Sequence, residues 1–384
     1  MTSWEQARAA AAGLAPLDAV RVPLSEAAGL VLADELRADS DLPPFDASAM
    51  DGWAVAGEPP WRIVGDVTAG QASPSAVRRG EAVRVATGAP LPVGATAVVR
   101  LEHASADSGV VTAAGLPPEG TDIRLAGGEC RAGDTVAATG QVVVPALLGL
   151  AAAAGADTVV VIRRPRVDVL VIGDELMQVG QPSGPQLRDA LGPMLPPWLA
   201  AAGAAVAPAR HLPDDHDVLL SAVAGSTADL VVTTGSTGPG HTDHLHGVLA
   251  ELRAELPVDG VAVRPGHPML LARLPAGRTV AGLPGNPLAA VSGLLTLVLP
   301  ALRAMMGRRP DARRTAVMLE PVSGPPDDVR LLPIADGRPV LHVGPAMLRG
   351  LAGAEWVAVI PAGGVAAGTE VEVLALPGAT PPAP

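Results

Sequence analysis

Residues 167–176 read Val-Asp-Val-Leu-Val-Ile-Gly-Asp-Glu-Leu. The nearly continuous apolar run is typical of a strand that is buried on both faces of a parallel sheet. It ends in a turn that carries two carboxylates, Asp174 and Glu175. Two further apolar runs, residues 230–234 and 279–281, are also followed by glycine-rich turns. This stretch therefore predicts one strand of an α/β sheet whose strands end in functional turns.

Helical patterns separate these apolar runs, over residues 187–203, 217–224, 244–252 and from 287 to 306. Strands that alternate with helices predict a mostly parallel sheet covered by helices on both faces. In such sheets ligands bind at the carboxyl ends of the strands. We therefore expect the turns after the three strands to face one crevice. The pattern also predicts that prolines break the 187–203 helix, and that residues 260–263 form a further strand.

The flanking segments predict additional domains, as a chain of 384 residues allows. Short alternating runs bounded by Gly and Pro over residues 53–126 indicate a small β domain, and similar runs, including 340–343, indicate a second after residue 309. Short helices are expected over residues 3–13, 25–32 and 145–155. The predicted fold class is a multidomain α/β plus β protein.

Composition excludes several classes of protein. The net charge is −12 and no basic run occurs, which argues against a nucleic-acid partner. A single cysteine, Cys130, excludes a disulfide framework and a cysteine-based zinc site. The apolar tract 142–162 is interrupted by Pro145 and three other residues, which favours strand–helix–strand over a membrane span. No signal-peptide pattern opens the chain, so we expect a soluble cytoplasmic protein.

A proline-stiffened loop lies at residues 43–55, Pro-Pro-Phe-Asp-Ala-Ser-Ala-Met-Asp-Gly-Trp-Ala-Val. Asp-Gly before an apolar run is typical of a turn that leads into a strand. Asp51 is either part of an ordinary capped loop or a ligand on a rigid functional loop. The segment alone favours the first interpretation. Thr87 ends another predicted strand, where a hydroxyl often bonds its own backbone.

Carboxylates on turns suggest a magnesium site. Asp51, Asp174, Glu175 and Asp243 lack basic neighbours in sequence, and Mg²⁺ takes one or two carboxylates plus waters and phosphates. Helix capping by Asp174 is the alternative. The turns 235–240 and 282–286 can present N–H groups to an anion, but neither matches a Walker A loop or a complete dinucleotide fingerprint.

Two other chemistries find little support in the sequence. His241, His244 and His246 could form a zinc site only if all three faced one ion, and on a helix His246 points away from the other two. The Gly-x-Ser-x-Gly pattern does not occur, so a serine-hydrolase elbow is unsupported.

Five motifs in order resemble those of the molybdopterin molybdenumtransferase family, the molybdenum insertases that include the gephyrin E-type domain. They are Pro-Pro-Phe-Asp-x-Ser-Ala-Met-Asp-Gly at 43–52, Thr-Gly-Ala-Pro at 87–90, Gly-Asp-Glu-Leu at 173–176, Pro-Gly-x-Pro at 265–268 and Leu-Pro-Gly-Asn-Pro at 283–287. The similarity covers nearly the whole chain, and it raises Asp51 from a loop acid to a functional acid.

The resemblance implies four domains and a homodimer. Residues 1–40 and 127–165 would form a helical linking domain, and residues 41–126 an inserted β domain. Residues 166–308 would form a three-layer α/β molybdopterin-binding domain, and residues 309–384 a β-barrel-like domain. Partners implied by the family are adenylated molybdopterin, the molybdopterin adenylyltransferase and recipient molybdoenzymes, with no nucleic acid and no membrane.

The resemblance also implies an activity, the Mg²⁺-dependent insertion of molybdate into adenylated molybdopterin with release of AMP. The catalytic and metal-binding residues would be Asp51, Glu175 and Asp243. The substrate-binding residues would be Thr87, Gly88, Asp174, Gly235, Arg264, His267, Pro284, Gly285 and Asn286.

The sequence departs from the family pattern mainly where the family binds an oxyanion. Arg264 and His267 replace two lysines, and Ala289 and Pro345 stand where serines are usual. Guanidinium and ammonium groups are not interchangeable. Glu129 stands where the family usually has Asp, and the usual Asp-Ser-Asn is replaced near residues 186–189. These departures keep open a second hypothesis, a diverged paralogue that binds the pterin nucleotide or a partner protein without inserting metal.

Overall fold

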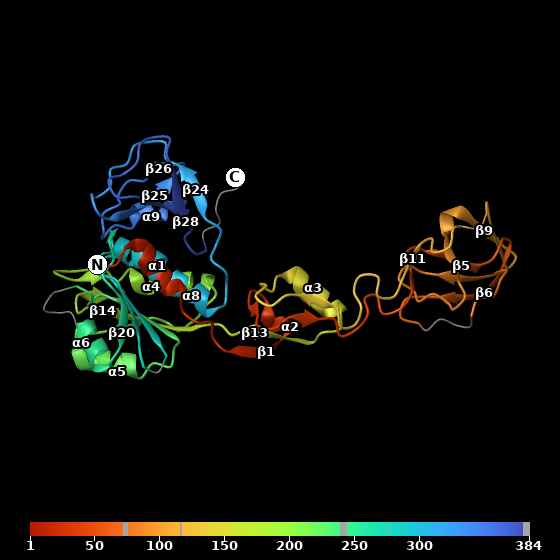
Figure 1. Cartoon of the computed structure of the whole chain (residues 1–384), viewed down its shortest axis with the longest axis horizontal. Helices are drawn as coiled ribbons and strands as arrows, with labels where there is room; N and C mark the ends of the chain where they lie inside the picture. Colours follow the sequence, from red (N-terminus) through yellow and green to blue (C-terminus); the bar gives the residue numbers. More distant parts are fainter. Residues whose placement is uncertain (72–75, 116, 239–243, 276, 379–384) are drawn as a thin grey trace. The chain divides into compact units, whose positions relative to one another are not determined.

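The computed structural model describes residues 1–71, 76–115, 117–238, 244–275 and 277–378 (Figure 1). The chain divides into two compact units. The smaller unit is Arg21–Val161, and the larger unit combines Met1–Val20 with Ile162–Pro384. Residues 1–20 thus group with the later part of the chain, although the sequence assigned them to the helical segment. The four-domain division itself stays a prediction.

The larger unit contains a seven-stranded, mostly parallel sheet of strand order β17-β14-β19-β23-β22-β20, with β18 also paired to β14. β14 pairs in parallel with β17, β18 and β19, and β19 pairs in parallel with β23. β22 and β20 add an antiparallel edge. The strands are β14 (Arg166–Ile172), β17 (Ala205–Val206), β18 (Arg210–Leu212), β19 (Leu230–Thr234), β20 (Glu255–Asp259), β22 (Leu270–Arg273) and β23 (Thr279–Leu283).

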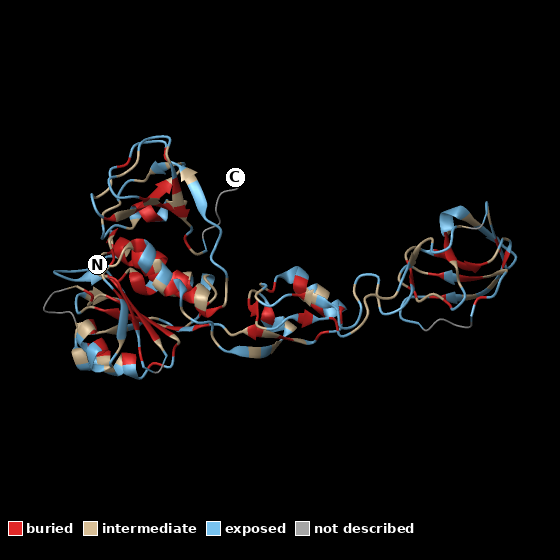
Figure 2. Ribbon diagram, in the orientation of Figure 1, coloured by how far each residue is buried: buried red, intermediate tan, exposed pale blue. Residues whose placement is uncertain are grey.

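Helices cover both faces of this sheet, as predicted. Successive side chains of a strand point to opposite faces, so Val167, Val169 and Val171 pack with α1, α4, α7 and α8, whereas Leu170 and Ile172 pack with α5 and α6. Figure 1 shows the two helical layers, and Figure 2 shows the buried strands between them. The helices are α1 (Trp4–Ala12), α4 (Leu191–Ala201), α5 (His216–Ala224), α6 (His244–Glu251), α7 (Pro287–Gly293) and α8 (Leu299–Met305).

The prediction for residues 187–203 was wrong in two respects. Leu187–Arg188 form strand β16, which pairs in parallel with β15 (Leu176–Met177), so the helix begins only at Leu191. The prolines do not break it, because Leu195 and Leu199 hold the helix against the core. Tertiary packing here overrides the local preference of proline.

The N-terminal helix α1 is docked on a π-helical segment, Leu294–Val298, which joins α7 to α8. Ser3 and Gln6 form a reciprocal capping box at its start. In π geometry the carbonyl of Leu295 would pair with residue 300, but Pro300 has no N–H. The Arg8 guanidinium donates to that carbonyl instead, at 3.0 Å. Trp4 Nε1 also donates to Thr296 Oγ1 at 3.1 Å.

The continuous helix Pro287–Met305 has the length and mean hydropathy, 1.8, of a membrane span. However, 89% of its apolar window is buried inside the protein. It covers one face of the sheet and contributes to the largest hydrophobic core. In this fold it is a core helix.

A second sheet follows in the larger unit, with strand order β21-β25-β27-β28-β24 and β26 paired to β25. Leu332, Ile334, Ala358 and Val371 belong to its core. Two predictions were wrong here. Residues 260–263 do not form one strand, because the strand β21 begins only at Val263 and pairs with β25 of this sheet. Residues 340–343 do not form a strand. The elements are β21 (Val263–Arg264), β24 (Arg314–Val317), β25 (Val329–Ala335), β26 (Arg338–Pro339), α9 (Arg349–Ala352), β27 (Trp356–Ile360) and β28 (Glu370–Leu374).

The smaller unit contains the predicted small β domain, a six-stranded sheet of order β8-β5-β7-β6-β10-β9. Ala54 and Val83 pack into one core on this sheet, and Val55 and Ala82 pack into another. Both faces are therefore covered by side chains. The elements are β5 (Gly52–Ala56), β6 (Trp61–Val67), β7 (Glu81–Val85), β8 (Ala97–Arg100), the 3-10 helix η1 (Leu101–His103), β9 (Ala104–Asp107) and β10 (Val110–Ala113).

The rest of the smaller unit consists of two short helices and short strands. The helix predicted over residues 25–32 ends at Ala27, because Gly29 takes a positive φ of 75° and Val31–Leu32 form a strand. The predicted helix after residue 145 is present. The elements are β1 (Ala19–Pro23), α2 (Leu24–Ala27), β2 (Val31–Leu32), β3 (Leu36–Arg37), β4 (Ala47–Ser48), β11 (Ile123–Arg124), β12 (Thr135–Ala137), α3 (Pro145–Ala153) and β13 (Thr158–Ile162).

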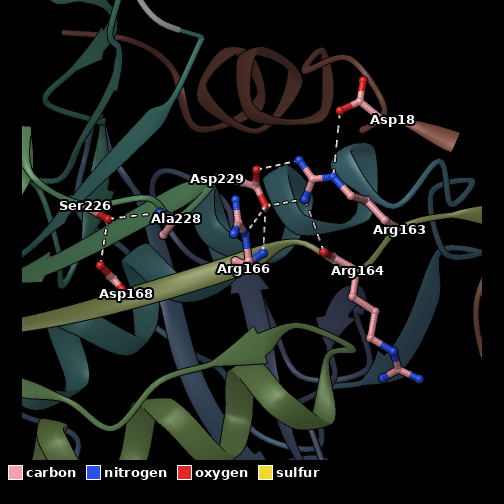
Figure 3. Close-up of polar contacts among 8 residues, drawn as sticks. All are labelled: Asp18, Arg163, Arg164, Arg166, Asp168, Ser226, Ala228 and Asp229. Atoms are coloured by element: carbon pink, nitrogen blue, oxygen red, sulfur yellow. Dashed lines mark hydrogen bonds and ion pairs between the residues drawn. The ribbon is translucent and has the colours of Figure 1, made fainter. Parts of the chain in front are cut away.

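A cluster of ion pairs and hydrogen bonds holds the first residues of β14 in the larger sheet (Figure 3). Arg163 donates through both terminal nitrogens to the Asp229 carboxylate, at 2.7 Å each, and the N–H of Arg166 donates to Asp229 at 2.8 Å. Burial alone would raise the pKa of Asp229, but the bonds from Arg163 and Arg166 outweigh it and lower the pKa. The start of β14 is thus tied to the residue before β19.

Candidate functional site

A crevice of about 770 Å³ lies at the carboxyl ends of β14, β19 and β23. The turns that follow these strands line it together, as expected for a parallel sheet. Gly235 and Gly285 contribute backbone to the wall, and Asn286 closes one side. Further lining residues are Gly173, Glu175, Leu187, Arg188, Asp189, Asp214, Thr234, Ser236, Pro287, Ala346 and Leu348.

Glu175 supplies a carboxylate to this crevice, and Gly173 allows its position. Gly173 has a φ of 154°, and a Cβ there would lie 2.6 Å from Glu175 Oε2. Any side chain at Gly173 would displace the Glu175 carboxylate. Since the glycine has no side chain, the acid can fold back over the end of β14.

Asp174 does not line the crevice and does not cap a helix. The strand β15, not a helix, follows it, so the capping alternative is wrong. The N–H of Asp174 donates to the Asp214 carboxylate, and the N–H of Asp214 donates to the Asp174 carboxylate, both at 3.3 Å. Asp174 thereby joins the Glu175 turn to the loop after β18.

A buried carboxylate at the crevice, Asp189, was not singled out by the sequence. Asp189 is 6% exposed, and its Oδ1 accepts the N–H groups of Leu191 (2.9 Å) and Gly192 (3.0 Å) at the start of α4. Its Oδ2 lies 2.7 Å from Nε2 of His211 on β18. Asp189 therefore fixes the helix start and the crevice wall. The sequence signal that could have revealed Asp189 is an acid two residues before Leu191, where α4 begins.

Arg188 is the cationic side chain that lines this crevice beside the acids. It was also not selected from the sequence. Its position at the end of β16 follows from pairing with β15, which no local pattern predicted.

The N-terminus of α7 does not offer free N–H groups to an anion in this structure. The N–H groups of Leu288 and Ala289 donate to the carbonyl oxygen of Pro345, at 2.9 and 3.3 Å. These two donors lie outside the 282–286 turn, so the anion-binding interpretation of that turn stays a prediction. Pro345, which the sequence showed as a departure from the family, caps the helix with its backbone.

A second cavity of about 520 Å³ adjoins the crevice, and Asn286 lines both. Its remaining lining includes Arg264, His267, Pro284 and Arg330. We call it the oxyanion cavity, since it gathers Arg264 and His267, which the family resemblance predicts to bind an oxyanion. Its walls also include Pro265, Gly266, Pro268, Ala289, Val343, Gly344 and Pro345.

The cations of the oxyanion cavity have partners within the chain. Arg264 Nε donates to Asp328 Oδ2 at 2.8 Å, and Arg330 donates to the carbonyl of Ser323 at 3.0 Å. His267 contacts the sulfur of Met1. Arg330 was missed by the sequence analysis, because it lies on β25, 66 positions after Arg264 in the numbering. It adds a positive charge to this cavity.

Gly266 is required at the oxyanion cavity. Its φ is 116°, and a Cβ would lie 2.9 Å from Met269 Cε and 3.0 Å from both the Ala289 carbonyl and Ser292 Cβ. The loop that carries Arg264 and His267 is thus packed directly on α7. Ala289 and Pro345, which also line the cavity, bring no hydroxyl donor to it.

Asp51 and Thr87 lie together in the smaller unit. The N–H and the hydroxyl of Thr87 both donate to Asp51 Oδ1, at 2.7 and 3.0 Å. These bonds, the backbone one foremost, lower the pKa of Asp51. Gly88, the next residue, has a φ of 79°, which a side chain would strain. The result is an exposed, ionised carboxylate on a rigid turn, with Oδ2 not used by Thr87.

The remaining predicted metal ligand, Asp243, lies outside the described residues, as does His241. Within the described parts of the chain, no group of three or more His, Cys, Asp or Glu side chains could hold a metal ion. His246 lies 2.9 Å from Asp259, whereas His244 packs edge-on against His216 at 6.3 Å. The two described histidines thus engage different partners, as the helical spacing predicted.

Comparison with known proteins places these observations in a family. Residues 2–155 match the model of the MoeA N-terminal region (domain I and II), and residues 168–304 match that of a probable molybdopterin binding domain. Molybdopterin molybdenumtransferase 2 of Mycobacterium tuberculosis strain H37Rv is 34% identical, over 92% of this chain and 94% of that protein.

Two further relatives agree with that match. A molybdopterin molybdenumtransferase of Staphylococcus aureus strain N315 is 32% identical, over 76% of this chain and 72% of that protein. The crystal structure of a molybdopterin biosynthesis MoeA protein from Pyrococcus horikosii superimposes with a TM-score of 0.84 at 25% identity, covering 98% of this chain and all of that one. The chain belongs to the molybdopterin molybdenumtransferase (MoeA) family of molybdenum cofactor biosynthesis.

Proposed function

We propose that this protein inserts molybdate into adenylated molybdopterin, with the help of Mg²⁺, and releases AMP. Support comes from family membership and from one feature of the larger unit. A crevice with a carboxylate, at the carboxyl ends of three parallel strands, adjoins a cavity that contains two arginines. Adjoining cavities, one with carboxylates and one with arginines, suit a reaction that joins a nucleotide-bearing substrate to a metal oxyanion.

The crevice fits the nucleotide part of the substrate. Gly235 and Gly285 let a ligand approach the backbone closely, and Arg188 can neutralise a phosphate. Glu175 and Asp214 present hard oxygen ligands on the same wall. These donors fit Mg²⁺, which accepts one or two carboxylates and completes its shell with water and substrate phosphates. When bound, the ion would offset negative charge at the phosphoanhydride.

Asp51 is the proposed acid of the smaller unit. Its carboxylate stays ionised because Thr87 donates to it twice. Its joint role with Glu175 and Asp243 as a metal ligand remains a prediction. So do the roles of Asp174, Thr87 and Gly88 in substrate binding. Asp174, in particular, would act through the loop that it holds.

The oxyanion cavity is the proposed molybdate site. Arg264 and Arg330 would supply its positive charge, His267 and Pro284 would line it, and Asn286 would form its border with the crevice. Arg264 would bind the oxyanion while still paired with Asp328, which weakens its net attraction. We therefore expect weaker molybdate binding here than nucleotide binding in the crevice.

We further propose the assembly and the location implied by the family. The protein would be a cytoplasmic homodimer that receives its substrate from the molybdopterin adenylyltransferase and passes the cofactor to recipient molybdoenzymes.

A second candidate function is nucleotide binding without metal insertion. Specific observations favour it: Ala289 and Pro345 bring no hydroxyl, and the carbonyl of Pro345 already accepts the N–H groups of Leu288 and Ala289. A protein with this cavity could hold the adenylated pterin and still fail at the metal step.

One experiment separates the two functions. The protein is incubated with adenylated molybdopterin, molybdate and Mg²⁺, and AMP and molybdenum cofactor are measured by chromatography. We expect AMP release that stops when EDTA removes Mg²⁺. Tight nucleotide binding by calorimetry, without AMP release at any molybdate concentration, would instead establish the binding function. An insertase-deficient strain that regains growth on nitrate provides the same test in cells.

A further inference from the structure

A third cavity, of about 300 Å³, lies in the larger unit between α1, the helix that ends at Met305, and the strand β28. It shares no lining residue with the crevice or the oxyanion cavity. We call it the arginine cavity. The inference that follows does not depend on the proposed function.

The arginine cavity has an unusual charge for this protein. Its lining contains five guanidinium groups and two carboxylates, which gives a formal charge of +3, whereas the whole chain carries −12. In contrast, Arg188 faces three acids, Glu175, Asp189 and Asp214, in the crevice. The charged lining residues of the arginine cavity are Arg8, Arg303, Arg308, Arg313, Arg314, Asp311 and Glu372.

Ion pairs within the arginine cavity do not cancel this charge. Asp311 pairs with Arg303, and Glu372 pairs with Arg313 at 3.2 Å. Both acids thus already hold an arginine each. Arg8 interacts with the Leu295 carbonyl and with the ring of Trp4, and such contacts orient a cation but do not neutralise it. The cavity as a whole stays positive.

Partial burial makes it less favourable in free energy for two of these guanidinium groups to carry their charge. Arg8 and Arg308 are both partly buried. Burial, and then the nearby charge of Arg303, lower the pKa of both guanidinium groups, although nearby acids partly oppose this at each. Positive groups held close together, two of them partly buried, attract a counter-anion. The structure therefore favours an anion in this cavity.

The walls between these charges are apolar. Leu295, Leu299 and Pro300 line one side, and Val373 and Leu374 line the other. An apolar body can fit between them, and a volume of about 300 Å³ is in the range of small-molecule sites. Guanidinium groups bind carboxylate and phosphate with two parallel hydrogen bonds.

We propose that the arginine cavity binds a small organic anion that has a phosphate or carboxylate head and an apolar body. Nothing in the proposed reaction uses this site. Its position also places it between the α/β core and the C-terminal sheet of the same unit, so a bound ligand would contact both.

Calorimetry with three simple probes tests this proposal on the whole chain at constant ionic strength. Phenyl phosphate and benzoate carry the two possible heads on the same apolar ring, and phenol carries no charge at neutral pH. We expect the two anions to bind and phenol not to bind. The tighter of the two identifies the head. Absence of heat with both anions at 10 mM, roughly the weak limit for a specific small ligand, would overturn the proposal.

Matched variants locate the binding. Arg308→Gln removes a lining guanidinium, whereas Arg309→Gln removes an exposed neighbour that does not line the cavity. We expect about a tenfold loss of probe affinity in the first and no change in the second. Arg314→Gln, at an exposed lining position, repeats the test should Arg308→Gln fold poorly.

Equal probe affinity in all three variants and the unmodified protein would show that the anions bind elsewhere. AMP release by the Arg308→Gln protein should stay unchanged, since the arginine cavity lies outside the proposed active site. This readout keeps a failure of this inference separate from a failure of the proposed function.

Discussion

The crevice and the oxyanion cavity adjoin each other at Asn286, yet they differ in the acids and hydrogen-bond donors that line them. The crevice retains the Gly-Asp-Glu turn and a buried acid, Asp189, that fixes its wall. In the oxyanion cavity Ala289 and Pro345 supply no hydroxyl group, and Arg264 is paired with Asp328. The side that would handle the nucleotide is preorganised, whereas the side that would handle molybdate has few donors.

This difference indicates that two adjoining cavities of one domain can differ in how many fixed donors they offer. Preorganised groups stabilise a reaction because they do not need to rearrange when charge develops. A cavity with few donors can still bind an oxyanion by charge, but less tightly. We therefore expect changes in the crevice to have large effects and changes in the oxyanion cavity to have small ones.

The largest effect is expected for Glu175→Gln. This variant removes the negative charge of the crevice carboxylate and keeps its shape, so AMP release should fall by about 100- to 1,000-fold. The measurement is initial AMP release at saturating Mg²⁺. Glu251→Gln, an exposed change on α6, serves as the control. Wild-type rates in Glu175→Gln would remove Glu175 from the site.

Asp51→Asn should lower AMP release by about 100-fold, because Asn cannot supply the ionised carboxylate. Circular dichroism should show an unchanged fold, since Asp51 is exposed. Asp66→Asn, at another exposed acid of the smaller unit, is the control.

The pH dependence offers a second test of Asp51. Thr87 lowers the pKa of this carboxyl, so it stays ionised at any pH above its ordinary range. Protonation of Asp51 should therefore cause no fall in the rate of AMP release between pH 7 and pH 5. The unmodified protein and Asp51→Asn should show the same relative change in rate over this range. A fall that occurs in the unmodified protein but not in Asp51→Asn would mean that the carboxyl titrates in that range, contrary to the geometry.

Asp189→Ala should lower the free energy of unfolding by about 2–3 kcal/mol, because it leaves buried N–H groups of α4 and His211 without their acceptor. Urea denaturation measures this loss. Asp217→Ala changes a carboxylate that is 94% exposed in its side chain and should cost under about 0.5 kcal/mol. Equal losses in both variants would show that Asp189 does not fix the crevice wall.

The smallest effect is expected for Ala289→Ser, which restores one hydroxyl to the oxyanion cavity. A single neutral hydrogen bond should tighten molybdate binding by about two- to tenfold, measured by calorimetry after adenylated molybdopterin is bound. His267→Ala should change it little. The unmodified protein could instead bind molybdate tightly and lose that binding in His267→Ala. This result would show that the oxyanion cavity is preorganised as well, contrary to the comparison above.

Much of the larger unit could be predicted from the sequence, because its strands are continuous apolar runs. β19 (Leu230–Thr234), for example, begins and ends at the predicted residues. The predictions failed where pairing between distant segments decides the structure. Leu187–Arg188 became a strand only because β15 lies beside it, and Val263–Arg264 joined the C-terminal sheet through β25.

Local runs and motifs are enough to recognise the family, the α/β pattern and the turns that carry Glu175 and Asp51. Which groups meet depends instead on how the sheets and helices pack. This packing brought Arg330 to Arg264, placed the Pro345 carbonyl on α7, and gathered five arginines around one cavity. Side chains distant in sequence interact only after sheets and helices have packed, and no local pattern records that packing.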